Sequence, residues 1–394
     1  MDPSLSLRVQ RIKPSPTLAI TARAKALTDA GEKIISLGAG EPDFDTPDHI
    51  KQAAIEAINS GFTKYTAVDG TPGLKRAVAD KFRRENHIEY QTNQILVSCG
   101  GKHSFYNLCQ ALLNKNDEVI IPAPYWVSYP DMVLLADATP VIINSTMEHG
   151  FKITPQQLDA AITKNTKAVV INSPSNPTGS VYSRDELNAL GDVLRKHPQV
   201  LAISDDIYEH VMLNDEPFLN ILNVCPDLYD RCVVLNGVSK AYSMTGWRIG
   251  YAGGPQWLIK GMENIQSQST SNPTSISQVA AQAALNGDQS FIKKMEAAFK
   301  ERHQFVVSSL NSIDGVSCLN SEGAFYSFPD FSGVISNLDN VNNDLELAEY
   351  FITQAKVAMV PGSAFGAPGF MRLSFATSME NLRNAMDRIK NVLG

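Results

Sequence analysis

The sequence predicts an α/β protein with a largely parallel sheet, followed by a smaller α+β unit at the C-terminal end. Two observations support this prediction. Short β-rich runs alternate with helical patterns through the middle of the chain, whereas the last third combines a long helical pattern with short strands. In addition, the chain has 394 residues, of which 43% are hydrophobic, and this is enough for a large core and for two domains.

Buried strands are expected in the middle of the chain, where apolar and β-branched residues form short runs. They cover residues 95–98, 118–121, 168–171, 201–204 and 232–235. Between them, residues 102–113 and 184–196 place apolar side chains on one helical face, which is typical of βαβ units. Ligands of open parallel sheets bind beyond the carboxyl ends of the strands, so the residues just after each strand are the candidates for a site.

The C-terminal third has a different pattern. We expect a long helix around 289–311, short strands near 324–328 and 370–375, and a closing helix from Met379. The apolar run at 34–37 is expected to join this smaller unit from the N-terminal side. The polar stretch at 266–275 indicates a loop or the start of a helix.

The composition argues against several classes of protein. A net charge of −7 provides no basic surface for nucleic acid, and no apolar run approaches the length needed to span a membrane. The N-terminal residues lack the apolar core of a signal peptide. The five cysteines show no CxxC spacing and the seven histidines no metal-ligand spacing. We therefore expect a cytoplasmic protein with reduced thiols, no structural metal, and no nucleic-acid or membrane partner.

Lys240 comes shortly after the strand at 232–235 and is the most informative residue of the chain. A lysine at the end of a buried strand can become an amine nucleophile, because desolvation disfavours its charged form. Such an amine forms a Schiff base with an aldehyde. Ser239 and Arg248 could hold a phosphate nearby, and the combination suits pyridoxal 5′-phosphate. A lone lysine is usually an exposed surface residue, so this interpretation depends on the residues at the ends of the other strands.

Asp205 ends a strand that is otherwise apolar. A carboxylate there could pair with the pyridine nitrogen of the cofactor and keep it protonated, which makes the ring an electron sink. The alternative is a helix N-cap, for which Asp206 is the better candidate. Asn176, in an Asn-Pro-Thr-Gly turn, and Tyr208 could donate hydrogen bonds to the phenolate oxygen of the cofactor. Asn-Pro and Thr-Gly are also ordinary turn signals.

Three further features suggest residues that bind a phosphate, a carboxylate and the pyridine ring. Gly100 and Gly101 precede a helix, whose N-terminus could bind a phosphate. Trp126 could stack on the pyridine ring or could belong to the core. Arg372 lies in an apolar strand, where its fork suits a substrate α-carboxylate, and a structural salt bridge is the alternative.

Taken together, these residues and the run at 40–44 resemble class I of the fold-type I pyridoxal-phosphate aminotransferases, from about residue 5 to the end of the chain. Residues 14–17, 101–102 and 124–130 are similar to the bacterial-type aspartate aminotransferases, some of which accept prephenate. The resemblance implies a large domain at 46–285 with a mostly parallel seven-stranded sheet between helices, and a small domain at 286–394. Residues 1–45 would form an N-terminal arm and part of the small domain.

The resemblance also implies a homodimer with shared active sites, in which Tyr65 reaches the partner's cofactor phosphate. The expected reaction is a ping-pong transamination through an imine at Lys240, with L-aspartate and 2-oxoglutarate giving oxaloacetate and L-glutamate. Lys240, Asp205 and Tyr208 are the expected catalytic residues. Cofactor contacts are expected from Gly100, Gly101, Lys102, Trp126, Asn176, Asp205, Tyr208, Ser239, Lys240, Arg248 and Tyr65. Substrate contacts are expected from Gly40, Trp126, Asn176 and Arg372, and at the distal carboxylate from Lys102, Thr17 and Ser15.

Other functions stay open at this point. The amino acceptor could be prephenate, giving arogenate, or the chain could be another aminotransferase or a lyase of the same fold. A regulator that kept the cofactor pocket would need a DNA-binding region, for which no spare segment or basic patch is evident. A nicotinamide-dependent enzyme would need a GxGxxG turn after its first strand, which residues 38–40 do not complete.

Overall fold

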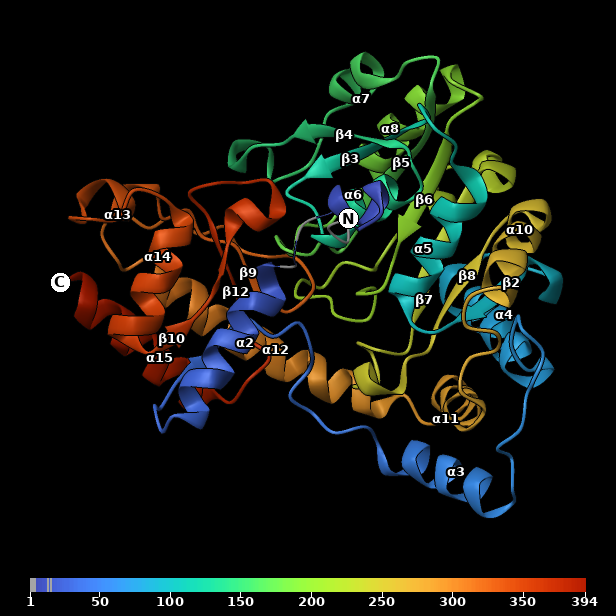
Figure 1. Cartoon of the computed structure of the whole chain (residues 1–394), viewed down its shortest axis with the longest axis horizontal. Helices are drawn as coiled ribbons and strands as arrows, with labels where there is room; N and C mark the ends of the chain where they lie inside the picture. Colours follow the sequence, from blue (N-terminus) through green and yellow to red (C-terminus); the bar gives the residue numbers. More distant parts are fainter. Residues whose placement is uncertain (1–4, 13, 15) are drawn as a thin grey trace.

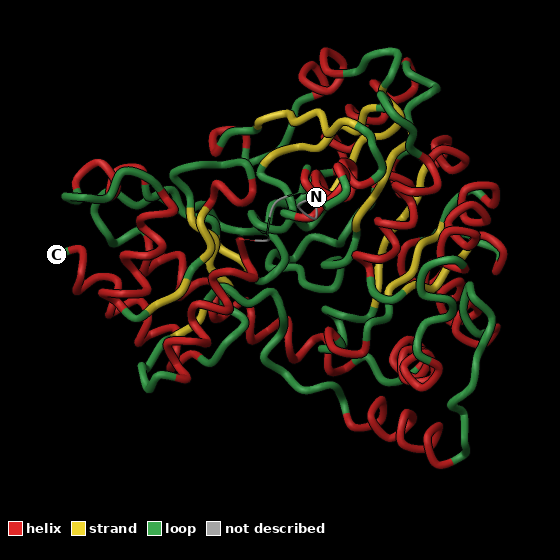
Figure 2. The backbone as a smooth tube through the Cα atoms, viewed as in Figure 1, coloured by secondary structure: helices red, strands yellow, loops and turns green. Residues whose placement is uncertain are grey.

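The computed structural model describes residues 5–12, 14 and 16–394. Figure 1 shows a larger α/β part on the right and a smaller part on the left, which contains the C-terminus. The long helix α12 (Ser290–Leu310) extends from one part toward the other. The loops at the ends of the parallel strands lie in the middle of the molecule, between the two parts (Figure 2).

The larger part contains a seven-stranded sheet, counted over the described residues. Neighbouring strands pair in parallel except at β8, which is antiparallel to both of its neighbours, so the expected mostly parallel sheet is confirmed. In spatial order the strands are β2 (Ile95–Ser98), β8 (Gly250–Gly253), β7 (Cys232–Gly237), β6 (Leu201–Asp205), β5 (Thr166–Asn172), β3 (Glu118–Ala123) and β4 (Thr139–Asn144).

Both faces of this sheet are buried under helices. Neighbouring residues of a strand belong to different apolar clusters, as Val169 and Val170 of β5 do, because successive side chains point to opposite faces. One face is covered by α4 (Pro72–Asn86), α8 (Arg184–Lys196) and α11 (Ser275–Asn286). The other is covered by α5 (Gly101–Leu112), α6 (Ser128–Leu135) and α10 (Gln256–Ser267).

The smaller part has a separate apolar cluster, built around α12 and the closing helix α15 (Met379–Leu393). It contains a three-stranded antiparallel sheet of β11 (Val360–Pro361), β12 (Met371–Ser374) and β9 (Tyr326–Ser327). The N-terminal strand β1 (Ile35–Ser36) pairs in parallel with β10 (Val357–Ala358), so the expectation that residues 34–37 join this unit is confirmed. The domain boundaries after residues 45 and 285 stay a prediction.

The five expected strands and the long helices are confirmed to within about two residues. Strand β4 is not among the predicted strands, because Pro140 lies within it and much of its surface is exposed, both of which weaken a strand pattern. The alternative interpretation, in which Asp206 caps a helix, does not hold. The chain turns after β6 without forming a helix, and Asp206 is buried, accepting hydrogen bonds from Ser204 Oγ at 2.6 Å and Asn220 Nδ2 at 2.9 Å.

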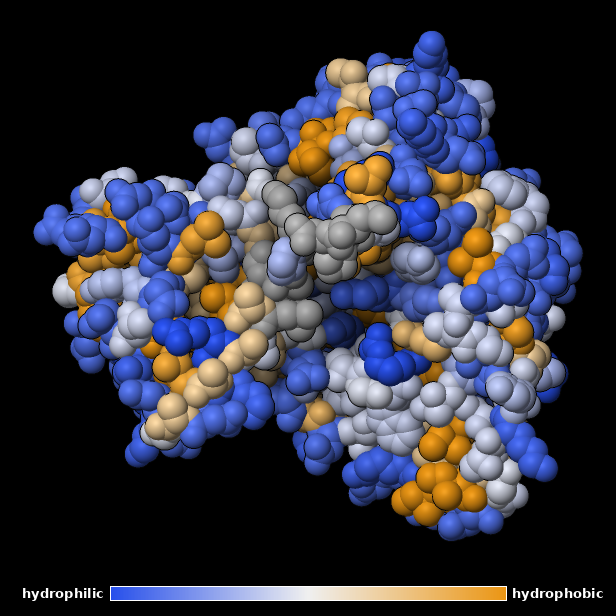
Figure 3. All heavy atoms as spheres, in the orientation of Figure 1, coloured by the Kyte–Doolittle hydropathy of each residue, from blue (hydrophilic) through white to orange (hydrophobic). Residues whose placement is uncertain are grey.

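Helix α3 (Asp48–Asn59) lies at the edge of the larger part and packs on α11. Its outer side carries Ile55 and Ile58, which are 48% and 50% exposed, and Phe62 follows at 41%. Figure 3 shows an apolar patch at this lower edge of the molecule. None of the helices in the described part of the chain is both long and apolar enough to cross a membrane.

Candidate active site

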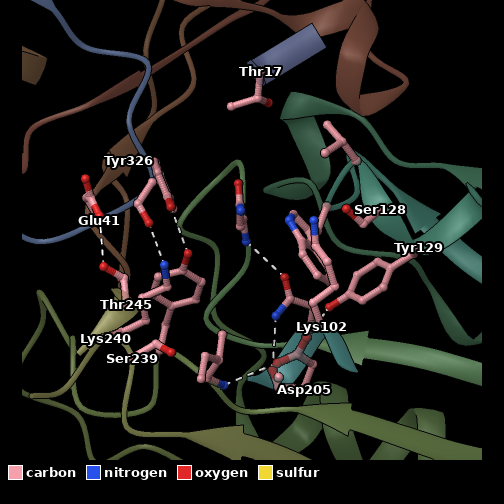
Figure 4. A pocket seen from close by; sticks show the side chains of 18 of the residues that line it. Thr17, Glu41, Lys102, Ser128, Tyr129, Asp205, Ser239, Lys240, Thr245 and Tyr326 are labelled. Carbon is pink, nitrogen blue, oxygen red and sulfur yellow. Dashed lines mark hydrogen bonds between the residues drawn. The ribbon is translucent and has the colours of Figure 1, made fainter. Parts of the chain in front are cut away.

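A cavity of about 430 Å³ opens beyond the carboxyl ends of β5, β6 and β7, where residues of both parts of the molecule meet (Figure 4). This is the sheet edge at which the sequence predicts a site. Twelve of the predicted site residues line it: Thr17, Gly40, Gly101, Lys102, Trp126, Asn176, Asp205, Tyr208, Ser239, Lys240, Arg248 and Arg372.

Lys240 lies just beyond β7 and presents its amine to the cavity. Nζ donates a hydrogen bond to the carbonyl oxygen of Gly40 and lies 5.6 Å from the ring centroid of Tyr208. Burial lowers the pKa of Lys240 to about 8, and the positive charge of Arg372 acts in the same direction. The neutral amine is therefore far more populated near neutral pH than it is for an ordinary lysine, which favours a role as nucleophile or base.

Asp205 ends β6 and lies at the floor of the cavity with 9% of its surface exposed. Its carboxylate accepts hydrogen bonds from the hydroxyl of Tyr129 and, at 3.3 Å, from the backbone N–H of Ile207. Burial raises its pKa, while both hydrogen bonds and the nearby Lys240 oppose the shift. Asp205 is thus held by hydrogen bonds and faces the cavity, and it has no ion-pair partner among the described residues. A carboxylate in this state can bind a cationic ring.

An anion-binding corner is formed where α5 begins. Gly100 has a φ of 93°, and a Cβ there would lie 2.2 Å from Nη2 of Arg248. A Cβ on Gly250 would lie 2.3 Å from the backbone nitrogen of Gly101, so both glycines allow the helix start to approach residues 248–250 closely. Arg248 donates to the carbonyl oxygens of Thr245 and Cys99, at 2.7 and 3.3 Å. The helix N-terminus and a guanidinium therefore lie side by side, which favours a phosphate.

Arg372 is 2% exposed and is held on several sides. Nη1 donates to Asn176 Oδ1 at 2.9 Å and Nη2 to the carbonyl oxygen of Gly38 at 2.8 Å. The guanidinium carbon lies 4.5 Å from the ring centroid of Tyr326 and 5.0 Å from that of Phe365. Within the described residues its Nε has no hydrogen-bond partner, and no carboxylate pairs with it. A structural salt bridge is therefore not what Arg372 makes here, and the group is free to bind a carboxylate.

A second cation, Lys102, lies in the first turn of α5 at the exposed side of the cavity. Its Nζ lies 5.2 Å from the ring centroid of Trp126. Burial lowers its pKa, and the charge of Arg248 lowers it further. Across the cavity, Oγ1 of Thr17 is buried without a hydrogen-bond partner in the described part of the chain. Thr17 thus offers an unpartnered hydroxyl to the cavity, and Lys102 offers a cation close to the phosphate corner and Arg248.

Among the described residues, two predicted site residues are not brought to the cavity wall. Gly100 lies just behind it, at the N-cap of α5. Tyr65 is 92% exposed and does not line the cavity of its own chain. Ser15 lies outside the described residues.

Several lining residues are not among those predicted from the sequence. Tyr129 binds Asp205, Tyr326 contacts Arg372, and Glu41 accepts a hydrogen bond from Thr245 at 2.8 Å. The run at 125–129 was a usable signal for Tyr129, since residues 126–129 all line the cavity. Tyr326 carried no sequence signal, because its strand has only two residues and its partners lie far away along the chain.

A buried ion-pair cluster supports the turn that carries Asp205 and Tyr208. Glu209 is bound by the ammonium of Lys81 and accepts hydrogen bonds from the amides of Asn86 and Asn236, each at 2.7 Å. His210 lies 2.9 Å from Glu85. Glu85, Glu209 and His210 bring ligand-type atoms together, but Lys81 forms ion pairs with both carboxylates, so the cluster anchors the turn to α4 and β7.

Comparison with known proteins places this site in a family. Residues 32–389 match the family model described as aminotransferase class I and II. The chain is 61% identical to an aspartate/prephenate aminotransferase of Nitrosomonas europaea, with 99% of each chain covered. It is 55% identical to a protein of the same name from Cereibacter sphaeroides, with 98% of each chain covered.

Solved structures agree with this assignment. The aspartate aminotransferase from Rhizobium meliloti has a TM-score of 0.95 and 47% identity, over 99% of this chain and 98% of that one. The Thermus thermophilus aspartate aminotransferase with maleate has a TM-score of 0.94 and 41% identity, over 99% of this chain and all of that one. With the amine, the buried carboxylate and the arginine in one cavity, these matches show that the chain belongs to the class I and II aminotransferase family.

Proposed function

We propose that this aminotransferase binds pyridoxal 5′-phosphate in the cavity and transfers amino groups between L-aspartate and 2-oxoglutarate, giving oxaloacetate and L-glutamate. The observation that carries the proposal is that the Lys240 amine, the Asp205 carboxylate and the Arg372 guanidinium line one cavity. Such a cavity can bind an aldehyde cofactor on one side and an amino acid's carboxylate on the other.

The donor set around the cavity fits this cofactor. The start of α5 at Gly100–Lys102, with Ser239 and Arg248, would hold the phosphate. Asp205 would pair with the pyridine nitrogen, and Trp126 would lie against the ring. The amide of Asn176 and the hydroxyl of Tyr208 would donate to the phenolic oxygen. When bound, the cofactor supplies an aldehyde that bonds to amines and a ring that withdraws electrons from them.

The protein residues supply positioning and proton transfer. Arg372 orients the substrate through its α-carboxylate, with the backbone at Gly40 and the amide of Asn176 beside it. Lys240 then accepts a proton from the substrate α-carbon at Nζ and later returns it, a role worth on the order of 10²–10⁴-fold. Its lowered pKa, about 8, keeps the amine able to accept that proton near neutral pH. Asp205 keeps its charge under the ring because Tyr129 and Ile207 hold it.

The substrate preference should be dicarboxylic. Arg372 takes the α-carboxylate, and Lys102 is the second cation in the same cavity. Thr17, with an unpartnered buried hydroxyl oxygen, and Ser15 would complete the distal end. Relatives at 55–61% identity that are named aspartate/prephenate aminotransferases support this preference. Because prephenate also carries two carboxylates, it is our second candidate acceptor, with arogenate as the product.

We further propose a homodimer with shared sites. The apolar side chains of Ile55, Ile58 and Phe62 are exposed at one edge of the molecule, and the fully exposed Tyr65 comes shortly after them. Burying this patch against a second copy would place Tyr65 near the partner's cofactor phosphate. We also propose that the enzyme acts in the cytoplasm, because all five cysteines are free.

The test is a donor and acceptor screen on the purified protein supplied with pyridoxal 5′-phosphate. ¹⁵N-labelled aspartate and 2-oxoglutarate should give oxaloacetate and ¹⁵N-labelled glutamate. Label that appears only as ammonia would instead indicate a lyase. Lys240→Ala should lose the activity and the covalent link to the cofactor, which borohydride reduction and mass spectrometry detect. Lys115→Ala, at an exposed loop position, is the matched control and should keep both.

A further inference from the structure

Tyr326 joins two functional groups of the cavity that the proposed function treats separately. It lies on β9 and its side chain is fully buried, although its hydroxyl reaches the cavity wall. The ring packs on the guanidinium of Arg372, at 4.5 Å. The hydroxyl oxygen lies 2.8 Å from the hydroxyl oxygen of Tyr208, a contact drawn as a dashed line in Figure 4. Tyr326 therefore contacts the carboxylate-binding arginine and a cofactor-facing tyrosine at once.

The position of the Tyr326 hydroxyl is tightly defined. A Cβ on Gly40 would lie 2.9 Å from this oxygen, so only a glycine leaves room for it there. The backbone carbonyl of Tyr326 accepts a hydrogen bond from Ser321 Oγ at 2.8 Å, and its strand pairs with β12, which carries Arg372. The ring, the hydroxyl and the arginine are thus held on two paired strands, and the side chain has little freedom to turn away.

The direction of the hydrogen bond between the two tyrosines is set by charge. Each hydroxyl has one proton, so one tyrosine donates and the other accepts. Burial raises the pKa of both tyrosines and the positive charge of Arg372 opposes this, and it is the ring of Tyr326 on which the guanidinium packs, at 4.5 Å. Tyr326 is therefore the better donor. If Tyr208 accepts from Tyr326, its own proton is free to point into the cavity, where the proposed cofactor's phenolic oxygen would lie.

We propose that Tyr326 is a positioning residue that couples the carboxylate site at Arg372 to the hydrogen bond that Tyr208 donates in the cavity. This inference rests on the proposed function. With Arg372 unpaired, its charge strengthens the donation from Tyr326 to Tyr208, and Tyr208 in turn donates more strongly. A substrate carboxylate on Arg372 neutralises that charge and weakens both hydrogen bonds. Binding of the carboxylate is thereby transmitted to the cofactor through two hydroxyl groups.

The test uses the cofactor-loaded protein and a dicarboxylate that cannot react, maleate. The bound cofactor changes its visible absorbance with pH, so each variant has a titration midpoint without and with saturating maleate. Tyr326→Phe keeps the ring on Arg372 and removes only the hydroxyl. A net hydrogen bond is worth about 0.5–1.5 kcal/mol, so the maleate-induced shift of the midpoint should fall by roughly 0.4–1 pH unit in this variant.

Two further variants separate coupling from packing. Tyr182→Phe is the matched control, since its buried hydroxyl accepts from Ile153 N–H and does not line this cavity; both of its midpoints should equal those of the wild type. In a Tyr208→Phe background, adding Tyr326→Phe should change the maleate-induced shift no further, because the accepting hydroxyl is gone.

The outcomes are distinct. A maleate-induced shift in Tyr326→Phe equal to that of the wild type would overturn the coupling. It would also be overturned if the change in this shift in the double variant equalled the sum of the changes in Tyr208→Phe and Tyr326→Phe. Weaker maleate binding with an unchanged shift at saturation would make Tyr326 a packing residue for Arg372 and would also overturn it. A wild-type protein that takes up no pyridoxal 5′-phosphate would refute the proposed function itself, and the inference with it.

Discussion

Replacing Lys240 with an uncharged residue should make the cofactor-free protein more stable. Lys240 is partly buried between aromatic rings, and its pKa is lowered from 10.5 to about 8, with burial as the largest cause. At pH 7 the folded protein must hold a protonated amine in a place that disfavours its charge. Lys240→Met keeps the unbranched, apolar stem of the side chain and removes that charge.

The lowered pKa of Lys240 sets the size of the expected gain in stability. A shift from 10.5 to about 8 corresponds to a destabilisation of about 3 kcal/mol at pH 7, at 1.36 kcal/mol for each pH unit. This is an upper limit, because the cavity admits water to the amine. The carbonyl of Gly40 loses its donor in the variant, which costs about 1 kcal/mol. The net expectation is that Lys240→Met is more stable by roughly 1–2 kcal/mol at pH 7.

The sign of the pH dependence makes the prediction specific. Between the folded-state pKa, about 8, and the unfolded-state value of 10.5, the unfolded wild-type chain binds more protons, so its stability rises with pH. The extra free energy of unfolding of Lys240→Met over the wild type should therefore be largest below pH 8 and should disappear as the pH rises toward 10.5. Urea denaturation of the cofactor-free proteins at a fixed protein concentration measures this. The exposed-site control is Lys115→Met, whose difference from the wild type should not vary with pH in this way.

A Lys240→Met protein that is less stable than the wild type at every pH would refute the reasoning. So would a stability difference that stays constant between pH 7 and pH 10.5, since the penalty would then not arise from the ammonium charge.

Three other predictions concern the reaction and the dimer. Asp205→Asn should still bind pyridoxal 5′-phosphate but lower kcat by roughly 10- to 100-fold, the loss of one charge-assisted hydrogen bond; kcat near that of the wild type would argue against pairing with the ring nitrogen. Lys102→Ala should lower kcat/KM for aspartate about 10- to 100-fold more than for alanine, and equal losses on both would assign Lys102 to structure or phosphate binding. Mixing inactive Lys240→Ala with an inactive Tyr65 variant should restore activity in hybrid dimers, and subunits that exchange without regaining activity would contradict the shared site.

Much of the site could be predicted from local sequence. Strand ends are visible as apolar runs that stop at polar or glycine-rich residues, and parallel strands bring those ends to one edge. The sequence pattern alone therefore predicts that Lys240, Asp205 and the start of α5 at Gly101 lie together. Arg372 is identified because a charge inside an apolar strand needs a partner. The domain boundaries and the roles of these residues remain predictions.

What the tertiary structure alone decided are the contacts between residues far apart in the chain. No local pattern places the hydroxyl of Tyr326 against Tyr208 or its ring on Arg372, since those contacts depend on how the smaller part packs on the large sheet. The burial of Asp206 away from any helix, and the support of Asp205 by Tyr129, arise in the same way. Local sequence was enough to identify the chemical groups at the strand ends, such as Lys240 and Asp205, because backbone periodicity is local. Packing decided which of those groups touch, because that depends on side chains brought together from distant elements.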